Sequence, residues 1–132
     1  MHVVTVLLDT HAFLWWVFAD PKLSRKARTA INDDSENDVF VSAASAWEIA
    51  TKYRIGKLPN AGVVADDIAG AVITEGFSQL SVSVRHAQRA GNLAGHHQDP
   101  FDRMLIAQAL LEDLALVSNE RAFDAYGVHR LW

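Results

Sequence analysis

The chain has 132 residues, of which half are hydrophobic and 21% are charged, and it carries a formal net charge of −4. Its length suits a single domain, residues 1–132, with a hydrophobic core of its own, and its composition excludes intrinsic disorder. The absence of cysteine excludes a disulfide framework, a thiolate metal site and a cysteine nucleophile. No apolar stretch approaches the roughly 18 residues of a membrane span, and no basic leader precedes the first strand-like run. We therefore expect a cytoplasmic protein that does not contact a membrane.

The first half of the chain alternates strand-like and helix-like segments. Val3–Leu8 is a continuous apolar run rich in β-branched residues, which is typical of a strand buried on both faces. Ser24 is a suitable N-cap for a helix, and Gly56 is suited to end one. After the first strand, the pattern predicts helices over 10–18 and 24–33, a strand over 39–41 and a helix over 43–55.

The second half continues the alternation. It begins with a less regular helix over 63–75, a strand over 77–82, a short helix over 83–90 and a loop over 91–98. Asp99 then predicts an N-cap, with Pro100 in the first helical position, where its missing N–H costs nothing. That helix runs to Glu112 and is followed by a strand over 116–118, a short helix over 120–126 and a strand over 128–132. Together these elements predict an α/β fold with a parallel sheet and helices on both faces.

Four acidic residues lie where these strands and helices meet: Asp9, Glu48, Asp102 and Glu120. Open α/β sheets bind their ligands at the carboxyl ends of the strands. Carboxylates gathered there repel one another unless a hard cation joins them, and Mg²⁺ or Mn²⁺ is the usual one. The pattern therefore indicates metal-assisted chemistry on a phosphate ester.

Some of these acids also have a purely structural explanation. Asp9 is placed to cap the helix that follows it, and Asp99 before Pro100 is fully explained as a cap. Glu48 shares a polar stripe with Lys52 at i,i+4, which is a common arrangement on an exposed helix face. Periodicity alone therefore favours the protein surface for Glu48.

Asp102 and Glu120 also allow both a structural and a functional explanation. Asp102 occupies the first turn of its helix, where the helix dipole favours a carboxylate. Glu120 lies two residues after Ser118, itself a suitable N-cap, so capping explains this acid as well. No acid is decisive alone, and the metal-site hypothesis depends on their coincidence at strand ends.

Nearby basic and aromatic residues are less informative. His96–His97 lies in a polar loop, where solvation is the ordinary expectation. Trp15–Trp16 and Trp47 fit a core or an interface better than a base-stacking surface. Arg103 and Arg121 each adjoin an acid, where they would either grip phosphate or balance the local charge.

The motifs around the acids resemble those of PIN-domain ribonucleases, specifically the VapC-like toxins of type II toxin–antitoxin pairs. The resemblance spans nearly the whole chain, and its segment from 99 to 109 is quite specific. The matching segments are Leu7–Ala12, Ser42–Ala50, Arg54–Pro59, His97–Arg103 with the helix after it, Leu116–Glu120, Ala125–Val128 and Leu131–Trp132.

By this resemblance the fold is a PIN-like three-layer fold, with a central, mostly parallel β-sheet flanked by helices. Asp9, Glu48 and Asp102 match the family's acidic triad. Glu120 matches its fourth acid, for which the family usually has Asp, so this longer side chain would bind through water or sit differently. The resemblance also reverses the surface assignment of Glu48, because its polar stripe would face an acidic pocket.

The activity implied by the resemblance is metal-dependent endonucleolytic hydrolysis of RNA phosphodiester bonds. One or two Mg²⁺ or Mn²⁺ ions, held mainly by Asp9 and Asp102, would polarise the scissile phosphate and lower the pKa of a bound water. Glu48 and Glu120 would bind the metal directly or orient its water. The family further implies a small cognate antitoxin and a homodimer, with two dimers often joined through the antitoxin's DNA-binding part.

Two other classes of function stay open. One is a receiver-like phosphoacceptor signalling domain, which transient aspartyl phosphorylation would support and RNA cleavage would oppose. The other is a non-enzymatic binding module whose acids only cap helices. It predicts that Asp9→Asn and Asp102→Asn alter the thermal stability while metal has little effect.

Overall fold

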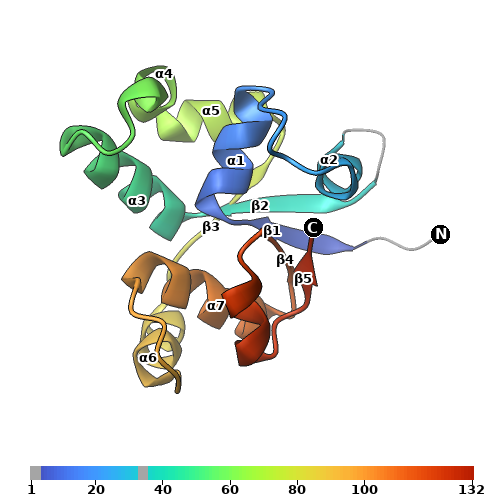
Figure 1. Ribbon diagram of the computed structural model, residues 1–132, viewed down its shortest axis with the longest axis vertical. Coiled ribbons are helices and arrows are strands. Elements are labelled where there is room, and N and C mark those ends of the chain that lie inside the picture. The colour runs from blue at the N-terminus through green and yellow to red at the C-terminus, as the bar shows by residue number, and fades with distance from the viewer. Residues whose placement is uncertain (1–3, 33–35) are drawn as a thin grey trace.

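A computed structural model describes residues 4–32 and 36–132 of the chain. Within these residues the centre is a five-stranded, all-parallel sheet with the strand order β3-β2-β1-β4-β5 (Figure 1). The strands are β1 Thr5–Leu8, β2 Asp38–Ser42, β3 Ser78–Leu80, β4 Ala115–Val117 and β5 Arg130–Leu131. The expected α/β fold with a central parallel sheet is confirmed.

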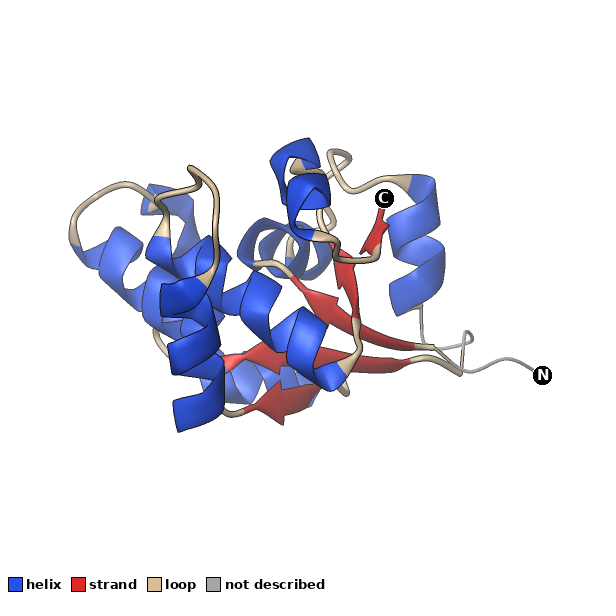
Figure 2. Ribbon diagram, turned by 90° about the horizontal axis from the view of Figure 1, so that it is seen from below, coloured by secondary structure: helices blue, strands red, loops and turns tan. Residues whose placement is uncertain are grey.

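Helices cover both faces of the sheet. One face carries α1 Thr10–Val17, α2 Arg25–Ile31, α3 Ala43–Arg54, α4 Gly62–Ala65 and α5 Ile68–Thr74 (Figure 1). The other carries α6 Val84–Asn92, α7 Pro100–Glu112 and the 3₁₀ helix η3 Arg121–Tyr126, and Figure 2 views the sheet from this side. A further 3₁₀ helix, η2 Pro59–Ala61, precedes α4. In the part of the chain described, no helix combines the length and the apolar character that a membrane crossing needs.

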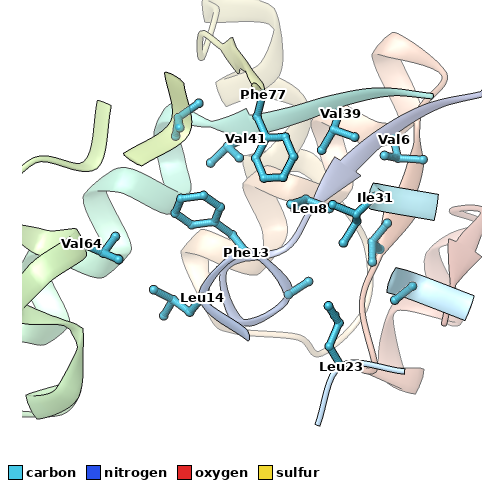
Figure 3. Packing of buried hydrophobic residues seen from close by; sticks show 14 of the residues in the cluster. Val6, Leu8, Phe13, Leu14, Leu23, Ile31, Val39, Val41, Val64 and Phe77 are labelled. Carbon is cyan, nitrogen blue, oxygen red and sulfur yellow. The ribbon is translucent and has the colours of Figure 1, made fainter. Parts of the chain in front are cut away.

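The core consists of two apolar clusters, one on each face of the sheet. Side chains alternate across a strand, so Val6 and Leu8 enter one cluster while Leu7 enters the other. In the larger cluster the Phe13 ring meets the Phe77 ring edge-on, with the centroids 6.3 Å apart (Figure 3). β1 is therefore buried on both sides, which explains its unbroken apolar sequence.

The chain changes direction across the sheet between β1 and β4. From β1 it adds β2 and β3 on one side, and it then returns to place β4 and β5 on the other. The Asp9 N–H donates to the carbonyl of Val117 at 3.0 Å, which extends the pairing of β1 with β4 by one residue. Ligands of open α/β sheets bind where the strand order reverses in this way, at the carboxyl ends. Asp9 and Ser118 lie at this point.

The predicted single helix over 63–75 is wrong. The segment forms two helices, α4 and α5, and the break falls at Asp66 and Asp67. The Asp67 carboxylate accepts a hydrogen bond from the Gly70 N–H at 2.9 Å and so starts a new helix instead of continuing the first. The helix expected over 83–90 also runs longer, to Asn92, which shortens the expected loop.

The other predicted elements are found, most of them with shifted ends. The helix expected over 120–126 is the 3₁₀ helix η3, which starts at Arg121 and is followed by the C-cap Gly127, where φ is +78°. The predicted start of the first strand at Val3 and the predicted end of the second helix at Asp33 lie outside the described residues.

Candidate active site

Asp9 lies at the carboxyl end of the central strand and is the N-cap of α1. Its Oδ1 accepts a hydrogen bond from the Ala12 N–H at 2.7 Å, which confirms the predicted cap. The Ser118 hydroxyl donates a second hydrogen bond from the end of β4. Only 7% of Asp9 is exposed, and this burial, with the charge of Asp102 adding to it, raises the pKa of the carboxyl to about 6. Asp9 is thus an acid whose negative charge lacks full compensation in the protein.

Glu48 is buried, with 3% of the residue exposed, so the surface position favoured by periodicity is wrong. Its Oε1 accepts a hydrogen bond from the Thr10 hydroxyl at 2.6 Å, and its Oε2 forms an ion pair with Lys52. Burial lowers the pKa of the Lys52 ammonium, but the hydrogen bond to Glu48 and the surrounding carboxylates outweigh that effect and raise it. The predicted i,i+4 pair therefore exists, but inside the protein and not on an exposed face.

Asp102 lies in the first turn of α7, as predicted. Asp99 caps this helix by accepting hydrogen bonds from the N–H groups of Phe101 at 2.9 Å and Asp102 at 3.1 Å. Burial raises the pKa of the Asp102 carboxyl, and the charges of Asp99 and Glu48 raise it further. A hydrogen bond with His97, whose Nε2 lies 2.8 Å from Oδ2 of Asp102, opposes this rise.

The structure brings three of the four predicted acids together, and we call Asp9, Glu48 and Asp102 the acidic site. The charge of Asp102 raises the pKa of Asp9, and the charge of Glu48 raises that of Asp102, so Asp102 is repelled by each of the other two acids. They come from the end of β1, from α3 and from α7, and α7 covers the opposite face of the sheet from α1. Among the described residues, no three His, Asp or Glu side chains are already arranged as a metal-binding cluster.

Glu120 stands apart from the acidic site. It is exposed, and it caps η3 by accepting a hydrogen bond from the Ala122 N–H at 3.3 Å. The charge of Glu120 helps to raise the pKa of the Arg130 guanidinium, which forms an ion pair with Asp124. No hydrogen bond or ion pair within the described ranges links Glu120 to the other three acids. Ser118, predicted as a cap, instead accepts from the Glu120 N–H at 3.0 Å and donates to Asp9.

His97 is a functional candidate that sequence reasoning missed, because loop solvation was the expectation for it. Its ring lies edge-on to Phe123 with the centroids 5.5 Å apart, and its backbone N–H donates to the Tyr126 hydroxyl at 3.1 Å. Its position could have indicated this role, because His97 lies five residues before Asp102 in the loop that leads into α7, a helix with a well-defined N-cap at Asp99. Thr10, which donates to Glu48, was also missed. Its hydroxyl at the end of a strand next to Asp9 could have indicated a hydrogen-bond donor to a buried acid.

Arg103 is not available to grip phosphate. Its guanidinium donates to the carbonyls of Ala90 and His97, each at 3.0 Å, and to those of Gly91 and Leu93. Four backbone acceptors occupy it, so this side chain anchors the loop between α6 and α7.

The PIN domain family matches residues 6–128 of the chain. Ribonuclease VapC22 of Mycobacterium tuberculosis is 28% identical over 127 residues, which cover 94% of this chain and 93% of that protein. Ribonuclease VapC16 of the same organism is 46% identical over 57 residues, so that match spans 43% of this chain and only 40% of the relative's own length.

Two solved structures share the fold. VapBC2 from Rickettsia felis, crystallised bound to a DNA fragment from its promoter, aligns with a TM-score of 0.63 at 15% identity over 93% of each chain. PAE2754 from Pyrobaculum aerophilum aligns with a TM-score of 0.50 at 15% identity, covering 98% of this chain and 92% of its own. Because the family match extends over nearly all of its residues, the chain belongs to the PIN domain family, as its motifs implied.

Proposed function

We propose that the protein is a metal-dependent endoribonuclease that acts as the toxin of a toxin–antitoxin pair. The observation that carries this proposal is the acidic site: Asp9 lies where the strand order reverses, and Asp102 is close enough to repel both Asp9 and Glu48. The curated relatives named above are ribonucleases, and VapC22 matches over nearly its full length.

The donors of the acidic site fit Mg²⁺ or Mn²⁺. Carboxylate oxygens are the hard ligands that these ions prefer. Burial and mutual repulsion raise the pKa of both Asp9 and Asp102, and a bound cation would relieve this cost. Asp9 and Asp102 would hold the ion. Both oxygens of Glu48 already have partners, so Glu48 would act beside it, and the exposed Glu120 would reach it through water.

When bound, such an ion supplies Lewis-acid polarisation of the scissile phosphate and lowers the pKa of an attacking water. The chain's own residues hold the acids in place for this chemistry. The Ala12 N–H and the Ser118 hydroxyl fix Asp9. Thr10 and Lys52 fix Glu48, and His97 fixes Asp102. These partners therefore set the geometry that the reaction uses.

The receiver-like alternative does not fit the topology. Receiver domains have the strand order 2-1-3-4-5, whereas this sheet has the order β3-β2-β1-β4-β5. The chain returns to the centre of the sheet one strand later than a receiver does. A phosphoacceptor role therefore has no structural support.

The proposal includes a cognate antitoxin and a homodimer, and it places the protein in the cytoplasm. The VapBC2 likeness supports the antitoxin at the level of the shared fold. Sedimentation of the chain, alone and with the product of a neighbouring short reading frame, tests both partners.

Incubation of the purified chain with mixed single-stranded RNA tests the activity. We expect cleavage with Mg²⁺ or Mn²⁺ and none with excess chelator. Asp9→Asn and Asp102→Asn should each slow cleavage by more than about a hundredfold, which exceeds the loss typical when a residue that only supports a metal ligand is replaced. Asp124→Asn is the matched control, because this exposed carboxylate pairs with Arg130. Unchanged cleavage by the Asp9→Asn variant would contradict the proposal and identify a contaminating nuclease.

A further inference from the structure

Trp47 is placed differently from the other three tryptophans. Its side chain is 62% exposed, although the next residue, Glu48, is buried. Trp15 packs against Trp132 with the ring centroids 5.8 Å apart, and the Trp16 Nε1 donates to Glu75 at 2.7 Å. The Trp47 indole N–H makes no hydrogen bond to any residue that the structure describes. Of the two positions considered for Trp47, the core is therefore wrong, and an interface stays a prediction; the exposed aromatic ring lies on α3 directly before Glu48.

The exposed indole is nevertheless held in place. The Phe101 ring meets it nearly edge-on, with the centroids 4.8 Å apart and the planes at 76°. The Lys52 ammonium lies over the Phe101 ring, 6.0 Å from its centroid. An aromatic surface that is ordered before binding loses less conformational entropy when a ligand ring stacks on it.

Trp47 and Phe101 border a cavity of about 310 Å³. This volume is at the small end of the range for small-molecule sites. Much of the wall is made of short side chains or flat rings, which leave room for a planar group between α3, α6 and α7: Ala43, Ala44, Ala90, Gly91 and Pro100. The shape suits one inserted ring better than the bulky face of a helix.

The cavity and the acidic site are joined by the residues that form them. Trp47 directly precedes Glu48, and Phe101 directly precedes Asp102. Lys52 contributes to both, because it pairs with Glu48 and lies over Phe101. A nucleotide chain with one phosphate at the acids would therefore carry a neighbouring base past these two rings.

We propose that Trp47 and Phe101 form a stacking site for one unpaired nucleobase of the RNA, adjacent to the phosphate that is cleaved. This inference rests on the proposed function, and it adds a subsite to it. Single-stranded RNA is recognised largely through unstacked bases on aromatic side chains, and every base offers a π-face for such a contact. The free indole N–H provides a donor for a base or phosphate oxygen, and Lys52 provides a cation next to the stack.

The test combines Trp47→Ala with a short, labelled single-stranded RNA in which one base at a time is removed while ribose and phosphate remain. Fluorescence anisotropy measures binding in an Asp9→Asn background, where the RNA stays intact. We expect Trp47→Ala to weaken binding about fivefold to a hundredfold and Trp47→Phe to stay within about threefold of the parent. One abasic position should weaken binding to the parent but have no further effect on Trp47→Ala. Val63→Ala is the matched control, since Val63 is a mostly exposed apolar residue on α4.

Equal losses from that abasic position in the parent and in Trp47→Ala would overturn the stacking site, as would unchanged affinity of Trp47→Ala. A variant that keeps its RNA affinity but sediments as a smaller particle would also overturn it and assign the cavity to a protein interface. Coupling between Trp47 and one base without any RNA cleavage would support the stacking site while the proposed function fails. Cleavage that needs Asp9 but shows no such coupling would reject the stacking site alone.

Discussion

The Nε2 atom of His97 lies 2.8 Å from Oδ2 of Asp102, so a loop residue holds one of the three carboxylates of the acidic site. The histidine ring is itself fixed by edge-on contacts with Phe123 and Tyr126. The other oxygen of Asp102, Oδ1, makes no hydrogen bond within the described residues. His97 therefore orients the Asp102 carboxylate and leaves one oxygen for a ligand, in the manner of groups that support metal-binding side chains.

Replacing His97 by Ala should weaken Mn²⁺ binding about 10- to 100-fold, because Asp102 loses the partner that orients it. Titration calorimetry measures this affinity directly, without any need for RNA cleavage. Tyr126→Phe is the control, since it removes the hydroxyl that accepts from the His97 N–H but keeps the ring contact. Wild-type Mn²⁺ affinity in His97→Ala would show that the hydrogen bond has no part in metal binding.

Asp9→Asn should stabilise the protein when metal is absent. The pKa of Asp9 is about 6 in the folded protein, against its usual 3.8, so between these values the unfolded chain binds fewer protons. The free energy of unfolding therefore falls as the pH rises from about 4 to about 6. Above this range the buried charge persists, and Asn, which still caps α1, should add up to about 3 kcal/mol.

Urea denaturation in chelator, at about pH 4 and about pH 7, measures this difference between Asp9→Asn and the wild type. The gain should be small at the lower pH, where Asp9 is protonated, and it should disappear when Mn²⁺ stabilises the wild type. Equal stability of the two proteins at neutral pH in chelator would contradict the raised pKa.

Lys52→Met should lower the free energy of unfolding by about 1–3 kcal/mol, because it leaves the buried Glu48 carboxylate without its cation. Combining it with Glu48→Gln removes the charge that needs compensation, so the double variant should recover part of the loss. A double-mutant cycle in urea measures the coupling between the two residues. Strict additivity of the two single changes would show that the ion pair contributes nothing to stability.

Gly127→Ala should cost about 1 kcal/mol of stability, since φ at this position is +78°, a left-handed conformation that side chains disfavour. An added Cβ meets no atom within 4 Å, so the cost comes from the backbone alone. Gly91→Ala, in the last turns of α6 and equally free of contacts, should instead be neutral or stabilise by up to about 1 kcal/mol. Thermal unfolding of both variants compares them, and a loss at Gly91 as large as that at Gly127 would refute the backbone explanation.

The parts of the fold that depend on local chemistry could be predicted from the sequence. Asp99 and Pro100 mark the start of α7 because capping and the missing proline N–H act within one turn, and α7 runs from Pro100 to Glu112 as predicted. The break between α4 and α5 was not predictable from apolar periodicity. It results from competition between continuing a helix and capping a new one at Asp67, and both choices suit the same sequence.

The candidate site likewise contains some residues that local sequence could predict and others that depend on tertiary packing. Asp9 was predictable because it directly follows the central strand, and Asp102 because the first turn of a helix favours a carboxylate. The burial of Glu48 follows from α3 packing near α1 and α7, which periodicity within α3 cannot show; only the family resemblance predicted it. The contacts of His97 and Trp47 likewise depend on segments that are distant in the chain. Whether Glu120 takes part in the reaction stays a prediction.

The anchoring of the loop by Arg103 has a mechanical consequence. Asp102 and Arg103 are consecutive residues of α7, and Arg103 holds the backbone carbonyl of His97. The helix thus carries both the acid and the segment that bears its histidine partner. Because Tyr126 of η3 also binds the His97 backbone, this one loop residue connects α7 and η3 beside the Asp102 carboxylate.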